Sequence, residues 1–271
     1  MKTHFLALAL AIPFVATNVF AQHSDVEFGV NDLLNPTELD FEVGAETDGT
    51  PLVTASGIPF FEADFEIVSE PGDPIDYAAE DPGFATAPDE GLEVNLGDQL
   101  FVNVLDGSSD ALFGGLGYVT FYNPATNALE ASGQINVQDN TAGTQDLLLD
   151  GASIFGNDNP QFVGTQQLDI TTGEPDGFDE HLVFDLVDDS LIGAFGLFLQ
   201  LELQSDFAGA TFDSDPFLVI LNRGLEEDVF EDFAVPAFVN ATVATAVPEP
   251  GTLALLTTAM SCLALRRRRF A

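Results

Sequence analysis

The sequence has very few basic residues, and almost all of them stand at its two ends. Of the six Lys and Arg residues, Lys2 lies near the start and four arginines occupy positions 266–269. Between residues 22 and 250, Arg223 alone opposes all 45 Asp and Glu residues, a net formal charge of −44. A surface of this charge repels nucleic acid and anionic lipid, so we expect direct binding to neither.

Cysteine and tryptophan are also scarce. Cys262 is the single cysteine and lies near the C-terminus, so residues 22–250 can form neither a disulfide framework nor a Cys-based zinc site. This span also lacks lysine, a Gly-x-Ser-x-Gly motif and a His-Glu-x-x-His motif. Trp, the usual platform for stacking sugars, is absent. We therefore predict that the protein is not an enzyme.

Apolar residues are plentiful, in contrast. Hydrophobic residues make up 46% of the chain and include 25 Phe, too many for a disordered acidic chain. We therefore expect residues 22–240 to fold. The high charge is typical of adaptation to a salty medium, where ions screen it, and a dedicated cation-binding role is the alternative.

Residues 1–21 have the pattern of a secretory signal peptide. Lys2 precedes an apolar run at residues 5–16, and Val19-Phe20-Ala21 offers small residues at a cleavage site. The apolar run is too short to span a bilayer. The pattern predicts export and cleavage after Ala21.

The other end of the chain has three parts in a fixed order. A small, uncharged tether at residues 241–247 leads to Pro248, Glu249 and Pro250, which cannot continue a helix. Residues 251–265 carry no charge and would form a transmembrane helix of about 22 Å, short against a hydrocarbon core of about 30 Å. The arginines at 266–269 would hold its end in the cytoplasm.

This order resembles the PEP-CTERM sorting signal (residues 248–271) of Gram-negative bacteria. The resemblance implies an exosortase as partner, a membrane-embedded cysteine transpeptidase that recognises the triplet and cuts nearby. It further implies a precursor anchored in the inner membrane by its C-terminal helix, then release to the cell surface or extracellular matrix, where polysaccharide is a further candidate partner. A plain membrane anchor is the alternative.

Between the ends, short apolar-alternating runs are separated by Gly, Pro, Asn and Asp, a pattern typical of an all-β protein. We predict a β-sandwich, with a jelly roll as one form of it, and a C-terminal transmembrane sorting helix. A short helix is expected at residues 222–233 and a surface loop at 70–90. The expected strands are 60–68, 92–105, 117–122, 129–137, 146–154, 161–170, 181–187, 195–203 and 216–221.

Residues 22–240 also resemble a family of PEP-CTERM proteins that is repressed by the zinc-uptake regulator. The similar segments are at residues 23–29, 117–124 and 180–186. The resemblance implies a protein made under zinc shortage, with a role in metal binding. Only two histidines remain after processing, which departs from what a zinc-binding role requires.

Two histidines, each beside acidic residues, are the candidate zinc ligands: His23 with Asp25, and His181 with Asp179. Neither pair supplies the three or four ligands of a tight site, so both would have to meet in the fold. Calcium is the other candidate metal, in acidic loops at 106–110, 139–140, 157–159 and 174–179, and ordinary turn chemistry also explains these loops. We expect Arg223 to pair with Glu226 or Glu227.

The sequence thus predicts an exported cell-surface or matrix protein without catalytic activity. The alternative is an extracellular zinc- or calcium-binding protein linked to metal homeostasis.

Overall fold

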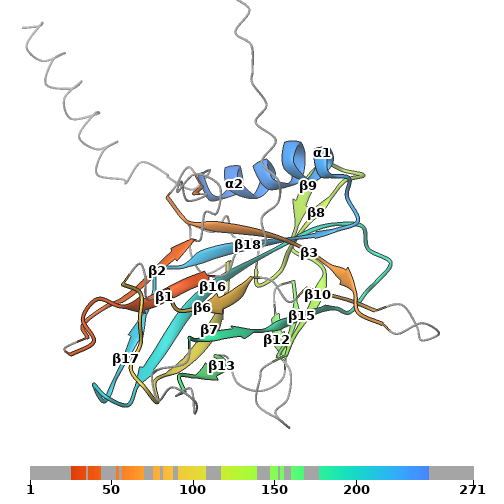
Figure 1. Cartoon of the computed structure of the whole chain (residues 1–271). Coiled ribbons are helices and arrows are strands. Elements are labelled where there is room, and N and C mark those ends of the chain that lie inside the picture. The colour runs from red at the N-terminus through yellow and green to blue at the C-terminus, as the bar shows by residue number, and fades with distance from the viewer. Residues whose placement is uncertain are drawn as a thin grey trace, which may run out of the picture.

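The computed structural model describes residues 26–243, apart from 35, 44–52, 55–56, 70–75, 80–81, 88–90, 108–116, 139–146, 152, 156–159 and 168–176. The predicted signal peptide and sorting signal lie outside this part. The described chain is mostly β, with strands in three sheets and one helical segment near its end (Figure 1).

The largest sheet is built around the long strand β16. Its main strand order is β13-β7-β16-β18-β3, while β17 and β8 also pair with β16 and β9 pairs with β8. Its strands are β3 (Phe60–Asp64), β7 (Gln99–Leu105), β8 (Thr120–Asn123), β9 (Ala128–Glu130), β13 (Gln161–Thr165), β16 (Gly193–Ser205), β17 (Ala210–Asp213) and β18 (Phe217–Arg223).

Two smaller sheets complete the β structure, with strand orders β14-β6-β1-β2 and β12-β11-β10-β15-β5-β4. The first comprises β1 (Val26–Val30), β2 (Leu39–Val43), β6 (Gly83–Ala85) and β14 (Asp179–His181). The second comprises β4 (Glu66–Ile67), β5 (Tyr77–Ala79), β10 (Gln134–Gln138), β11 (Leu147–Asp150), β12 (Ser153–Phe155) and β15 (Val183–Leu186).

One apolar core joins all three sheets. Alternate residues of β7 and β16 point to the same side of the large sheet, because successive side chains of a strand face opposite ways. They share one buried cluster with residues of both small sheets, including Phe28, Phe84, Val102, Ile135, Phe184, Leu197 and Leu199. The small sheets therefore pack on one face of the large sheet, and the prediction of an all-β fold is confirmed.

The helical segment covers the other face of the large sheet. It consists of α1 (Glu227–Val229), the π-helix η3 (Phe230–Ala234) and α2 (Val235–Val243). A second buried cluster joins Phe230 and Phe238 of this segment to Phe198 and Ile220 of the sheet. No helix among the described residues is long and apolar enough to cross a membrane.

The helix expected at 222–233 is misplaced at both ends. Asn222 and Arg223 belong to β18, and Gly224 then takes a φ of 69°, which ends the strand. The helical segment begins at Glu227 and continues to Val243, past the domain boundary expected at residue 240. Thr242 is buried against the sheet, so tertiary packing extends the helix into residues predicted to be a tether.

The expected surface loop at 70–90 contains two strands instead. β5 pairs with β15 and β6 pairs with β1, and Ala78, Ala79 and Phe84 are buried. The Pro, Gly and Asp residues around them obscure these short strands in the sequence. The strands β1, β2 and β17 are further additions to those expected, and β14 meets the expected strand 181–187 only at His181.

Two pairings in the sheets are parallel: β18 with β3, and β1 with β6. Both bring together segments that are far apart in the sequence. They depart from the antiparallel arrangement of a jelly roll.

Gly196 provides a test of the contact between α2 and the sheet. A Cβ at this position would lie 2.5 Å from Cε1 of Phe238, so Gly196→Ala should push α2 off β16. We expect a loss of about 1–3 kcal/mol in the free energy of unfolding, measured by urea denaturation. Gly177→Ala is the matched control, because no atom lies within 4 Å of the added Cβ. Equal losses for the two variants would contradict the packing described.

Candidate functional site

Asp179 and His181 lie on β14, at the edge of the four-stranded sheet. Residues two apart on a strand share a face, and Nε2 of His181 lies 3.6 Å from Oδ1 of Asp179. Their side chains are 40% and 71% exposed, in the order His181 and Asp179, so a metal ion could reach both. The structure thus brings together one of the two predicted pairs.

The other pair, His23 and Asp25, lies outside the described residues. The next residue described is Val26, which pairs with Phe84 of β6, and Phe84 pairs in turn with Glu180 of β14. Strands lie about 4.8 Å apart, so the start of β1 is roughly 10 Å from β14. The four-stranded sheet therefore places the start of β1 near the Asp179–His181 pair.

The part of the chain that the structure describes contains no larger cluster of possible metal ligands than this pair. No group of three or more His, Cys, Asp or Glu residues is placed there to hold a metal ion. Of the candidate calcium loops, 139–140 and 157–159 lie outside the described residues, and 106–110 and 174–179 are described only in part. Calcium binding by these loops stays a prediction.

Arg223 makes contacts that the sequence did not reveal. Its guanidinium lies 3.5 Å from the ring centroid of Tyr77, and its Nη2 donates a hydrogen bond of 3.1 Å to the backbone carbonyl of Asp189. The expected pairing with Glu226 or Glu227 was wrong, because the turn after β18 is held by hydrogen bonds of Asn222 with Leu225 and leaves the guanidinium facing Tyr77. Arg223 therefore links β18 of the large sheet to β5 of the six-stranded sheet.

Two carboxyl groups with a raised pKa lie on the elements that pack together where the helical segment meets the large sheet. Burial raises the pKa of Glu62 on β3 to about 7, and the nearby carboxylates of Glu231 and Asp64 contribute to this rise. Burial also raises the pKa of Glu231 on η3, with added repulsion from Glu227 and Asp232. Oε1 of Glu231 is buried without a hydrogen-bond partner. No sequence pattern singled out this pair.

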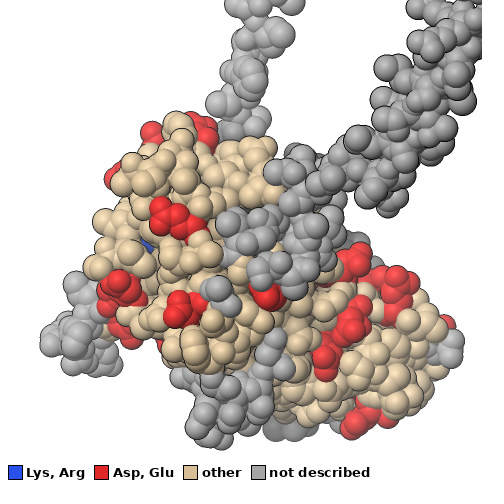
Figure 2. All heavy atoms as spheres, turned by 180° about the vertical axis from the view of Figure 1, so that it is seen from behind, with Lys and Arg blue, Asp and Glu red and all other residues tan. Residues whose placement is uncertain are grey.

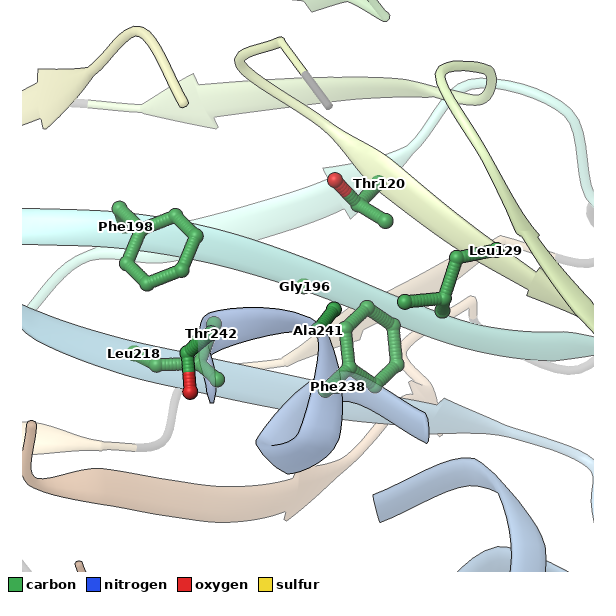
Figure 3. Close-up of a pocket in the computed structure, with 8 residues that line it drawn as sticks. All are labelled: Thr120, Leu129, Gly196, Phe198, Leu218, Phe238, Ala241 and Thr242. Carbon is green, nitrogen blue, oxygen red and sulfur yellow. The ribbon is translucent and has the colours of Figure 1, made fainter. Parts of the chain in front are cut away.

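A small pocket lies between α2 and the large sheet (Figure 3). Its volume of about 10 Å³ has room for roughly one water molecule. Thr242 in its wall donates its hydroxyl to the Val239 carbonyl at 2.7 Å. The pocket is too small for a substrate, and its lining is Thr120, Leu129, Gly196, Phe198, Leu218, Phe238, Ala241 and Thr242.

Acidic side chains are spread over the molecule. Figure 2 shows Asp and Glu side chains at several places on one face, some of them next to one another, with uncharged residues between these places.

Comparison with protein families finds one match, at the C-terminal end. The model described as the PEP-CTERM protein-sorting motif matches residues 246–269. The chain therefore carries this sorting motif, which implies export, processing by an exosortase and sorting to the cell surface. The prediction made from Pro248, Glu249, Pro250 and the residues after them is confirmed.

Comparison with other proteins adds little on the remaining residues. No curated protein matches the chain. Among solved structures, a mutant of the CFA/I adhesin CfaE from enterotoxigenic E. coli is similar at 10% identity, with a TM-score of 0.24. The match covers 76% of this chain and about half (51%) of the adhesin chain. A TM-score this low supports no conclusion about function, and the resemblance to a zinc-repressed family stays a prediction.

The Arg223 contact can be tested by substitution. Arg223→Met should lower the free energy of unfolding by about 1–2 kcal/mol, because it removes the contact with Tyr77 and the bond to Asp189. The loss is limited because Nε of Arg223 is itself buried without a partner. Urea denaturation would measure the change, and Arg223→Lys, which keeps the charge over the ring, should lose less. Unchanged stability in the Met variant would mean that the guanidinium does not hold the two sheets together.

Proposed function

We propose that the protein is a non-catalytic component of the cell surface or extracellular matrix, exported by its signal peptide and sorted by an exosortase. The match of the sorting motif to residues 246–269 is the observation that carries this proposal. Before processing, residues 251–265 hold the precursor in the inner membrane. After processing, the acidic β-sandwich is released to the exterior.

The order of parts along the chain supports this proposal. The last helix of the described chain, α2, ends at Val243, and the sorting motif begins three residues later. A folded domain followed directly by a sorting motif is the arrangement expected of a protein that is exported and then sorted by its C-terminal signal. The protease would meet the triplet at Pro248 close to the folded surface.

The absence of catalytic activity is proposed from chemistry. Residues 22–250 contain no Lys or Cys, and the pocket beneath α2 has room for about one water molecule. The carboxyl groups with a raised pKa, Glu62 and Glu231, lie on the elements that pack together where the helical segment meets the large sheet.

A matrix role is supported by charge. A net charge of −44 across residues 22–250 keeps the protein soluble and dispersed in a salty medium. Carboxylates spread over the surface bind divalent cations weakly at many places. Shared cations can then connect the protein to acidic matrix polysaccharides without a dedicated site.

Metal binding at a specific site is the second candidate function. It is favoured by the Asp179–His181 pair on β14 and by the position of the β1 start in the same sheet. His23 and Asp25 would supply the remaining ligands of a zinc site. Zinc held there would connect the four-stranded sheet to the N-terminus of the processed chain.

The sorting proposal is tested by replacing Pro248, Glu249 and Pro250 with alanine. In a host that has an exosortase, the variant should accumulate as uncleaved precursor in the membrane fraction, detected by immunoblotting. The parent protein should be processed and reach the exterior. Thr245→Ala is the matched control, because it lies directly before the residues that the motif covers, and it should be processed as the parent is. Equal processing of the triplet variant and the parent would exclude exosortase sorting.

The zinc proposal is tested by calorimetry in physiological salt. A specific site should bind zinc with a stoichiometry near one and stabilise the fold by about 2.7 kcal/mol when free zinc is 100 times its dissociation constant. His181→Ala and His23→Ala should each abolish this binding. Acidification through about pH 6.5 should weaken it, because protonated imidazole cannot bind a metal.

Binding by the acidic surface alone would give a different result. It would be weak, occupy many sites and be displaced by magnesium. Identical isotherms for the parent and both histidine variants would exclude the specific site.

A further inference from the structure

Glu62 lies on the face of the large sheet that the helical segment covers. Phe61 and Ala63 of β3 belong to the core between the sheets, whereas Phe60 packs with the helical segment. Because side chains alternate along a strand, Glu62 and Asp64 point to the same side as Phe60. Glu62 also pairs in register with Ile220 of β18, which contacts this segment.

The helical segment (residues 227–243) presents carboxylates to the same region. Its first turns carry Glu227, Asp228, Glu231 and Asp232, with no basic residue in the last turn of α1 or η3. In η3 the Val235 amide donates to the Phe230 carbonyl, and Phe230 and Ala234 are buried against the sheet. Their burial holds Glu231 at the contact, where its Oε1 has no hydrogen-bond partner.

No cation offsets these charges among the groups described around Glu62. β18 contributes Leu218, Ile220 and Asn222 to this face, and β16 contributes Ala194 and Phe198, all uncharged. The nearest titratable groups are Asp64 on β3 and Glu231 on η3, with Glu227 and Asp232 beside Glu231. Arg223, on β18, is occupied by Tyr77 and the Asp189 carbonyl.

We propose that the Glu62–Glu231 carboxyl pair makes the docking of the helical segment on the large sheet depend on pH. The segment docks tightly while Glu62 holds a proton. It loosens when both groups are ionised, because burial then penalises the charged Glu62 carboxylate and the charge of Glu231 adds repulsion, with no cation described beside them.

The direction of the pH effect follows from the raised pKa of Glu62. The pKa of Glu62 is raised from 4.5 to about 7 in the folded protein, so the folded state holds more protons than the unfolded state between these values. Docking is therefore strongest below about pH 4.5 and weakens as the pH rises to about 7. Above about pH 7 the full penalty of ionisation applies.

The consequence for sorting rests on the proposed function. Val243, the last residue of the segment, lies three residues before the sorting motif. A loosened segment would add up to 17 residues, from Glu227 to Val243, to the link between the β-sandwich and the triplet. The pH of the medium outside the cell would then determine the length of the link between the folded domain and the membrane-bound protease.

Amide hydrogen exchange of the full-length protein in detergent tests the docking directly. Peptides from the helical segment and from β16 would be followed between about pH 5.5 and 8.5, with each rate divided by its intrinsic rate at that pH. In the parent, we expect protection of the helical segment to fall about 30-fold as the pH rises, while β16 keeps its protection. Glu62→Gln should keep the segment protected at every pH.

Two further variants make the test decisive. Glu66→Gln, on exposed β4, removes a carboxylate outside the contact and should behave as the parent. Glu231→Gln removes the repulsion that adds to the desolvation of Glu62, so it should reduce the pH-dependent loss of protection, and it serves as the test if Glu62→Gln fails to fold. The proposal is overturned if the parent shows no pH-dependent loss of protection, if the loss persists in full in Glu62→Gln, or if Glu231→Gln does not reduce it. Cleavage is not measured, so failure of the sorting proposal would leave this result unchanged.

Discussion

Burial of the first half of β16, residues 193–199, on both faces is the constraint around which the rest of the structure is arranged. Phe195, Leu197 and Leu199 face the core between the sheets, whereas Ala194 and Phe198 face the helical segment. A strand that is apolar on both sides needs a layer on each side. The two small sheets supply one layer, and residues 227–243 supply the other. Without the helical segment, a continuous apolar surface of the large sheet would be exposed.

The charge of the chain makes this apolar packing essential. With 45 acidic residues against Arg223 between residues 22 and 250, ion pairs cannot stabilise the domain. Aromatic contacts therefore contribute a larger share of the stability of the domain. One example is the contact of the Phe28 and Phe178 rings, which meet edge to face with centroids 5.1 Å apart. The one arginine of this span is used at a contact between two sheets, over the Tyr77 ring.

The sequence indicated the β class and the approximate positions of β7, β16 and β18, because their apolar residues recur with a strand period. It did not indicate β5 and β6, since strands of three residues among Pro, Gly and Asp carry too little pattern. The Asp179–His181 pair was predictable because an acidic residue stands close to a histidine in the sequence, whereas β14, which puts both on one face, was not predicted, since the expected strand began only at residue 181. The Glu62–Glu231 pair was not, because residues 169 positions apart meet only once the helical segment docks.

The parallel pairing of β3 with β18 bears on how the domain forms. Phe60 of β3 aligns with Leu218 of β18. The early strand β3 can therefore form this pairing only once β18, one of the last strands, is present. Contacts of such long sequence separation slow folding, since the intervening chain must first be ordered. For a protein that crosses a membrane N-terminus first, β3 would emerge with its partner still inside. The sandwich is then completed only as the last strands, directly ahead of the sorting motif, reach the exterior, which ties the end of folding to the end of export.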